Sequence, residues 1–202
     1  MPYLLEVNEE RLETEFEAGK SFGFWTPRAV LPTDFAPVVR RKDVGTLYER
    51  SEIVLIRYGL VPPGFSSARE ADRYGLHEVR AKRVSWQREV GKLYNAGNRC
   101  LVPMTRGDEV IAAAGVWGKW TRVRGKRIAE RVESFCVFTV KDELEEWHPL
   151  ILERFDWHSW LEGSVGIEEI AAMPSSQSAS SLLPASQSRI QASVMSNMHA
   201  VR

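Results

Sequence analysis

The order of short apolar segments along the chain restricts its fold more than any other feature. Segments with the composition of β-strands follow one another with few helical segments between them, and strands and helices do not alternate regularly. A parallel sheet of βαβ units needs that alternation. The sequence therefore predicts an α+β fold with a mostly antiparallel sheet. The expected strands are Ala36–Lys42, Glu52–Gly59, Arg99–Met104, Glu109–Trp117 and Glu133–Val140, after a short one within Met1–Val7.

Three segments have the apolar spacing of amphipathic helices. The first follows Asn8, a residue suited to cap a helix, and runs to about Ala18. The second runs from Ser85 to near Gly97, and the third is a short helix around Trp160. Their apolar faces consist of Leu12 and Phe16; of Trp86, Val90, Leu93 and Tyr94; and of Trp157, Trp160 and Leu161.

The composition divides the chain near residue 170. The first part, residues 1–170, holds every expected strand and helix and is long enough for one domain with a sizeable core. The remainder, residues 171–202, is rich in serine, has no acidic residue after Pro174, and shows no apolar period. We expect this tail to be disordered or weakly docked.

Composition also excludes several classes of protein. No apolar stretch approaches the roughly 20 residues of a membrane span, and no signal region opens the chain, so we expect a cytoplasmic protein. Cys100 and Cys136 lie in apolar runs, which favours buried, reduced thiols. Zinc-ligand spacing and phosphate-binding glycine loops are not recognisable, so we expect neither a metal nor a cofactor.

The dipeptide Met1-Pro2 carries the most chemical content of any short motif in the chain. Removal of Met1 would leave Pro2 with a free secondary amine. Such an amine can attack an aldehyde and form an iminium ion. Alternatively, proline is simply a common second residue.

A series of short motifs occurs in a recognisable order. They are Leu31-Pro32-Thr33, Pro37-Val38-Val39, the run from Tyr58 to Pro62, the run from Arg99 to Pro103, and Glu133-Ser134-Phe135. Over residues 1–163 the order and composition of these motifs resemble the SOS-response-associated peptidase family, whose members cap abasic sites in single-stranded DNA. The tail has no counterpart in this resemblance.

The resemblance implies a strongly bent antiparallel sheet that approaches a barrel, with helices packed outside and a groove for single-stranded DNA. In the family, an N-terminal cysteine reacts with the ring-opened abasic sugar through its amine and thiol. An Asn and an Arg bind the sugar-phosphate, a Glu and a His assist proton transfer, and the family name implies removal of the protein's own first residue. By this resemblance the catalytic candidates are Pro2 and His148, and the DNA-binding candidates are Pro32, Thr33, Arg80 and Arg83.

The chain departs from the family pattern at several of these positions. Pro2 stands where the family has cysteine, so a thiazolidine crosslink is impossible, while a reversible iminium that favours β-elimination remains open. The Asn-Ala-Arg segment aligns with Glu78–Arg80 or with Ala81–Arg83, and either register keeps an Arg and loses the Asn. The segment that bears the family Glu is missing after Pro103, and Glu109 is the nearest glutamate that follows.

Basic residues form three clusters in a chain whose formal net charge is zero: Arg40–Lys42, Arg80–Arg83 and Arg122–Arg127. The third surrounds Gly125, and we expect it to be a solvated hairpin loop. The sequence leads to one main functional hypothesis, a monomeric abasic-site processing protein of divergent type that binds single-stranded DNA. The alternatives are an inactive descendant of the family, for example from a prophage, that only binds nucleic acid or has no retained activity, and an autopeptidase.

Overall fold

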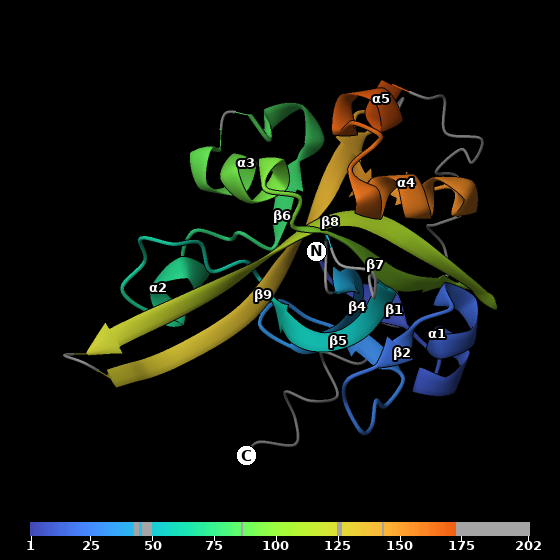
Figure 1. The fold of residues 1–202 in the computed structure, drawn as a ribbon. Coiled ribbons are helices and arrows are strands. Elements are labelled where there is room, and N and C mark those ends of the chain that lie inside the picture. Colours follow the sequence, from blue (N-terminus) through green and yellow to red (C-terminus); the bar gives the residue numbers. More distant parts are fainter. Residues whose placement is uncertain (43–44, 46–49, 86, 125–126, 143, 173–202) are drawn as a thin grey trace, which may run out of the picture.

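The computed structural model describes residues 1–42, 45, 50–85, 87–124, 127–142 and 144–172. Its central feature is a strongly curved sheet in which five strands close into a ring (Figure 1). Around the ring, β9 pairs with β5, β5 with β4, β4 with β7, β7 with β8, and β8 again with β9. Within this ring, β5 and β9 pair in parallel, and the other four pairings are antiparallel. The strands are β4 (Phe35–Lys42), β5 (Arg50–Tyr58), β7 (Arg99–Arg106), β8 (Glu109–Arg124) and β9 (Arg127–Lys141).

Shorter strands extend this sheet at its edges. β2 (Gly19–Lys20) pairs with β5, and β11 (Ile151–Leu152) pairs with β8. β6 (Glu78–Arg80) and β10 (Trp147–Pro149) both pair with β9. A separate two-stranded sheet joins β1 (Tyr3–Leu5) to β3 (Arg28–Val30). The predicted α+β class and the bent, mostly antiparallel sheet that approaches a barrel are therefore confirmed.

Helices pack around the outside of the ring. They are α1 (Glu9–Phe16), α2 (Ala68–Asp72), α3 (Arg88–Asn95), α4 (Trp157–Glu162) and α5 (Ile167–Ala172), with 3-10 helices at Ala81–Arg83 and Arg154–Asp156. The first begins as expected, because the Asn8 side chain accepts a hydrogen bond of 3.0 Å from the backbone N–H of Arg11.

The helix predicted from Ser85 begins three residues later, at Arg88. Val84 and Ser85 instead form the turn after the 3-10 helix, and this turn lies against Gly91. A Cβ atom at position 91 would come within 2.9 Å of the Val84 carbonyl oxygen, so the close approach needs glycine. Trp86, expected on the apolar face of this helix, lies outside the described residues.

The core is one apolar cluster that continues from the ring into the helices. Among the largest side chains with almost no exposed surface are Tyr58, Phe135, Phe138 and Trp160. Trp160 on α4 donates a hydrogen bond of 3.0 Å from Nε1 to the Cys100 carbonyl on β7, which fixes this helix to the ring. Both cysteines are fully buried and unpaired, as expected.

The strands β8 and β9 continue beyond the ring as a two-stranded arm, which we define as Lys119–Arg124 and Arg127–Glu133 (Figure 1). The prediction that Arg122–Arg127 forms a loop was wrong for the residues that the structure describes. Arg122 and Arg124 lie on β8, and Arg127 lies on β9 opposite Arg124. The strands extend this far because Trp120, at the base of the arm, is buried against Val61 and Ala71.

The C-terminal helix α5 ends at Ala172, two residues beyond the expected end of the domain. The rest of the predicted serine-rich tail, residues 173–202, lies outside the described residues. Among the described helices, none is long and apolar enough to cross a membrane.

Candidate functional site

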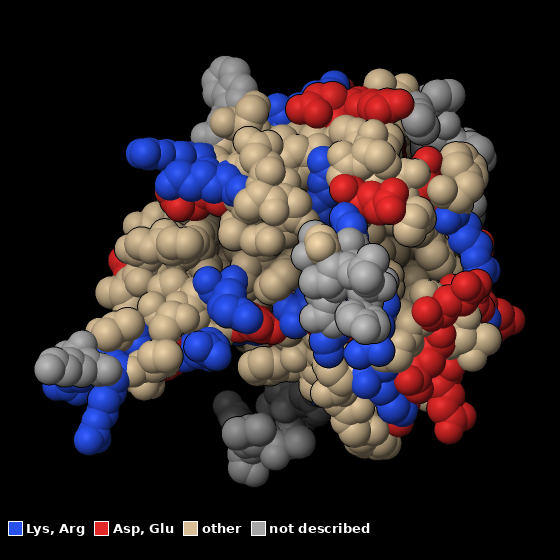
Figure 2. All heavy atoms as spheres, in the orientation of Figure 1, with Lys and Arg blue, Asp and Glu red and all other residues tan. Residues whose placement is uncertain are grey.

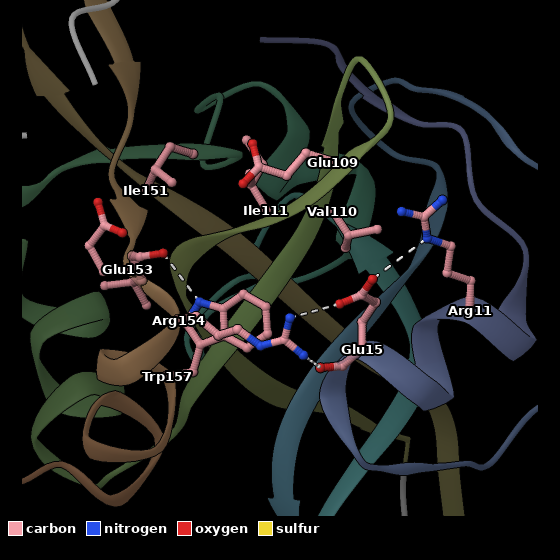
Figure 3. Close-up of a pocket in the computed structure, with 10 residues that line it drawn as sticks. Arg11, Glu15, Glu109, Val110, Ile111, Ile151, Glu153, Arg154 and Trp157 are labelled. Carbon is pink, nitrogen blue, oxygen red and sulfur yellow. Dashed lines mark hydrogen bonds and ion pairs between the residues drawn. The ribbon is translucent and has the colours of Figure 1, made fainter. Parts of the chain in front are cut away.

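A hollow of about 200 Å³ lies where α1 meets β8, β11 and the start of α4 (Figure 3). Its charged groups satisfy one another, since Glu15 pairs with Arg154 at 3.1 Å and with Arg11 at 3.7 Å. Glu109, the carboxylate considered as a substitute for the family Glu, lines this hollow and pairs with Arg106 at 2.7 Å. We interpret the hollow as a junction that ties α1 to the C-terminal segment.

The N-terminus forms a different constellation, around β6. The α-amino group of Met1 lies in direct contact with the Glu78 carboxylate. The Tyr58 hydroxyl donates a hydrogen bond of 2.9 Å to the Met1 carbonyl oxygen. His77 lies beside them, with its Nε2 atom 3.6 Å from Glu78 Oε1. An amine, a carboxylate, an imidazole and a phenol are thus gathered at one place.

The short strand β6 explains why Glu78 faces the N-terminus. β6 lies parallel to β9, with Glu78 opposite Val137 and Arg80 opposite Thr139. Val79 between them is buried, so alternation along the strand places the Glu78 and Arg80 side chains on the other face. The backbone before β6 is also held, because Leu60 N–H donates to the Leu76 carbonyl at 2.8 Å and Val137 N–H to the His77 carbonyl at 2.9 Å.

A small pocket of about 30 Å³ adjoins this constellation. Its lining includes Tyr58, Gly59 and His77 together with Pro32 and Thr33, two of the predicted DNA-binding residues. Thr33 has a φ of 79°, a left-handed conformation that is unfavourable for a β-branched residue. Its N–H donates a hydrogen bond of 2.7 Å to the Tyr58 carbonyl, which holds the residue in place. Backbone strain of this kind is concentrated at functional sites.

Burial changes the protonation of the groups at this site. Desolvation lowers the pKa of the Met1 α-amino group from 8.0 to about 6. Desolvation, and then the nearby amine, also lower the pKa of His77. The pKa of Tyr58 is raised, chiefly by burial. At neutral pH the amine and the imidazole are therefore mostly uncharged, and the Tyr58 phenol keeps its proton and acts as a donor.

The other predicted site residues lie around this constellation or apart from it. Pro2 follows Met1 directly and is partly buried. Arg80 is exposed, and its guanidinium lies 4.4 Å from the ring centroid of Trp147. Arg83 is an exposed residue at the end of the 3-10 helix Ala81–Arg83. His148 on β10 binds Asp142 Oδ2 at 2.9 Å, and within the described residues no contact joins it to the N-terminus.

His148 belongs to a group in which a metal ion has possible ligands. Ligand atoms of Asp142, Glu146 and His148 all lie within 4.8 Å of one another. However, Asp142 Oδ1 already accepts hydrogen bonds of 2.9 Å from the N–H groups of Leu144 and Glu146. These bonds stabilise the turn before β10, and they explain the cluster without a ligand.

Three residues of the constellation did not emerge as site residues from the sequence: Tyr58, His77 and Glu78. Tyr58 was noticed only as part of a motif, and Glu78 only as one of two positions where an Asn could have been lost. The usable signal was that, in one of the two registers, a carboxylate replaces an amide that the resemblance assigns to the binding of the sugar-phosphate. His77 has no signal beyond its place next to Glu78.

The chain was compared with known proteins. No protein-family model and no curated protein matches it. Solved structures do match: a protein from Bacteroides thetaiotaomicron is 17% identical with a TM-score of 0.66, covering 85% of this chain and 84% of that chain. A protein from Bordetella bronchiseptica is 20% identical with a TM-score of 0.64, covering 93% and 95%. A phage-related protein from the same bacterium is 13% identical with a TM-score of 0.55, covering 84% and 85%. At these identities the likeness shows a shared fold.

Proposed function

We propose that this chain is a divergent relative of the SOS-response-associated peptidase family, which binds single-stranded DNA and reacts with abasic sites through its N-terminal amine. The observation that carries the proposal is the pairing of the Met1 α-amino group with Glu78, beside His77 and Tyr58. An ordinary N-terminus is solvated and has no such set of proton donors and acceptors around it.

The chemistry requires an uncharged amine, and the low pKa of this group supplies one near neutral pH. The amine nitrogen attacks the aldehyde carbon of a ring-opened abasic sugar, and the carbonyl oxygen takes up a proton. Loss of water then forms an imine at Met1. If Met1 is removed, Pro2 forms an iminium ion instead. Glu78 and His77 are the groups within reach to accept and return the protons.

The absence of a thiol at position 2 determines the fate of this intermediate. A thiazolidine cannot form, so the imine or iminium remains reversible. Such an intermediate acidifies the proton on the adjacent sugar carbon. When that proton is removed, the 3′ phosphate leaves, which is lyase behaviour rather than durable crosslinking.

Groups suited to the DNA strand lie next to the amine. Arg80 is two residues from Glu78 on the same face of β6, and its exposed guanidinium is available to a phosphate. The half-buried Trp147 beneath it offers an aromatic surface near the same place. Proteins that bind single-stranded DNA typically combine basic side chains, which contact the phosphates, with aromatic side chains, on which the bases stack.

The test is reductive trapping. The protein is mixed with a single-stranded oligonucleotide that contains one abasic site, with and without borohydride, and the products are separated on a denaturing gel. We expect a covalent band only with borohydride, which mass spectrometry locates on the N-terminal residue, whether Met1 or Pro2. Glu78→Gln should reduce trapping by about a hundredfold or more, because one positioned proton-transfer group contributes about 10²- to 10⁴-fold.

Glu89→Gln is the matched control, since it removes the same charge from a carboxylate that pairs with Lys92 on α3. It should trap like the unchanged protein. Absence of the borohydride band would contradict the proposed reaction. Salt-sensitive retention of the DNA without any trapping would support the inactive, nucleic-acid-binding alternative.

A further inference from the structure

The arm formed by β8 and β9 is basic, although the chain as a whole has a formal net charge of zero. Residues 119–133 contain six basic and two acidic residues. Lysine and arginine gather at the far end of the arm, while acidic side chains gather over α1 on the other side of the molecule (Figure 2). The arm therefore carries a local positive charge that the zero net charge of the whole chain does not reveal.

Most of the positive charge in the described part of the arm has no acidic partner. Glu130 pairs with Arg122 at 3.3 Å and Glu133 with Lys119 at 2.8 Å, which accounts for both acidic residues of the arm. Within the described part of the chain, Arg124, Arg127 and Arg131 are exposed and have no carboxylate partner. The acidic residues of α2, beneath the arm, are engaged elsewhere: Glu70 with Ser66 and Asp72 with Arg57.

The arm is also held rigidly at its base. β8 pairs with β7 only as far as Val116, and β9 pairs with β5 only from Ser134, so the described part of the arm has no strand on either side. Trp120 is buried, and its Nε1 donates a hydrogen bond of 3.0 Å to the Phe65 carbonyl. A fixed two-stranded ribbon with arginines at its end thus projects from the ring.

We propose that the arm binds double-stranded DNA, with the ribbon in the major groove and its arginines on the phosphates. The major groove of B-form DNA, about 12 Å wide, admits a two-stranded β-ribbon. A-form RNA has a deep, narrow major groove that does not. Arginine matches the geometry of phosphate with paired hydrogen bonds. Val123 and Ile128, paired across the arm and both more than half exposed, supply apolar contact between the arginines.

This inference does not depend on the reaction proposed for the N-terminus. It concerns a different surface and undamaged DNA, so trapping and arm binding can fail separately. The experiment uses the full chain and measures the affinity for a fluorescent 20-base-pair DNA duplex at several salt concentrations. The variant Arg124→Ala/Arg127→Ala/Arg131→Ala should bind at least about tenfold more weakly. The slope of the logarithm of affinity against the logarithm of salt concentration (the salt slope) should be smaller by about 2 to 3, because up to three phosphate contacts are lost.

Two further variants control for charge and folding. Arg50→Ala/Arg69→Ala/Arg88→Ala removes three exposed arginines from β5, α2 and α3, and it should bind like the unchanged protein. The variant Arg124→Lys/Arg127→Lys/Arg131→Lys should keep most of the salt dependence, because the positive charges remain. Equal weakening by the two alanine variants would overturn the proposal, because binding would then follow total charge.

Two further ligands, an RNA duplex and poly-aspartate, distinguish DNA from other negatively charged partners. A 20-base-pair RNA duplex should bind several-fold more weakly than the DNA, and equal affinity would overturn the assignment to the major groove. Poly-aspartate at equal charge should compete poorly. If it displaced the duplex as well as unlabelled DNA does, the arm would be a surface for acidic proteins, and the proposal would be wrong.

Discussion

The α-amino group of Met1 experiences two opposing effects. The Glu78 carboxylate lies against this amine and favours its charged form, whereas burial removes water from the charge and lowers the pKa. Burial is the cause of the low pKa of this amine, which is about 6. A group that would ordinarily be largely protonated at pH 7 is therefore mostly neutral there, while it keeps a carboxylate close enough to take a proton from it.

We predict that the reactivity of this amine rises with pH through a midpoint near 6, about two units below that of the unfolded chain. The neutral amine is the nucleophile, so reactivity is lost as the pH falls through the folded pKa. Glu78→Gln should move the midpoint lower still, because the attraction that favours the charged form is removed. The measurement is the rate of N-terminal acetylation between pH 5 and pH 9, followed by peptide mass spectrometry. A midpoint near 8 in the folded protein would contradict the burial of this amine.

Among single residues, the sequence indicated two that lie near the N-terminus but not the side chains that contact the amine. Pro32 and Thr33 line the small pocket beside the N-terminus, and they came from a motif in the chain. Glu78 was missed because the resemblance led to an expected Asn, either there or at Ala81, and the carboxylate counted only as its loss. Only the pairing of β6 with β9, a contact over nearly sixty residues, brings the carboxylate to the amine.

Among the elements, the long strands β8 and β9 differ most from expectation. The predicted strands ended at Trp117 and began at Glu133, because the sequence between them is polar and does not alternate. The structure continues both strands outward, since Trp120 and Val132 on the arm face the segment that contains α2. A contact between elements far apart in the sequence decides the strand length, and local pattern cannot reveal it.

Trp120 should therefore control the docking of α2 against the arm. Trp120→Phe loses the hydrogen bond to the Phe65 carbonyl and should lower the free energy of unfolding by about 1 kcal/mol. Trp120→Ala also leaves a cavity and should cost about 3–5 kcal/mol. Urea denaturation measures the free energy of unfolding of each variant. In the Trp120 variants, amide exchange should be faster in α2 than in β4. Val123→Ala, at an exposed position on the same arm, should change the stability by less than about 0.5 kcal/mol. An unchanged stability of Trp120→Ala would show that the arm does not anchor α2.

For the whole molecule, closure of the ring is the property that the sequence alone did not determine. Individual strands were predicted from β-branched residues, and the bent sheet came from the resemblance. Closure depends on two parallel residue pairs between β5 and β9, Arg57 with Ser134 and Tyr58 with Phe135. The Ser134 hydroxyl, fully buried, accepts a hydrogen bond of 2.9 Å from the Val61 N–H at this closure.

The reactivity of the two cysteine thiols can test this closure, because they lie on different strands of the ring and are fully buried. A Cβ atom on Gly115, between them, would come within 3.0 Å of Cys100 Sγ and 2.8 Å of the Cys136 carbonyl oxygen. Burial raises the pKa of Cys136 to about 12 and that of Cys100 well above its usual value. Since the thiolate is the reactive form, neither thiol should react in the folded protein.

We predict that Cys100 and Cys136 become reactive together, at the rate of global unfolding, because neither β7 nor β9 can expose its thiol while the ring is closed. The test is labelling with a thiol reagent at increasing urea concentrations, with the modification of each cysteine measured separately by peptide mass spectrometry. The reference is the rate of global unfolding, which is monitored by tryptophan fluorescence. Equal labelling rates that match this reference would mean that the ring opens as one cooperative unit. Faster labelling of Cys136 alone would show that β9, the strand that carries both the arm and the β6 pairing, separates before the rest of the sheet.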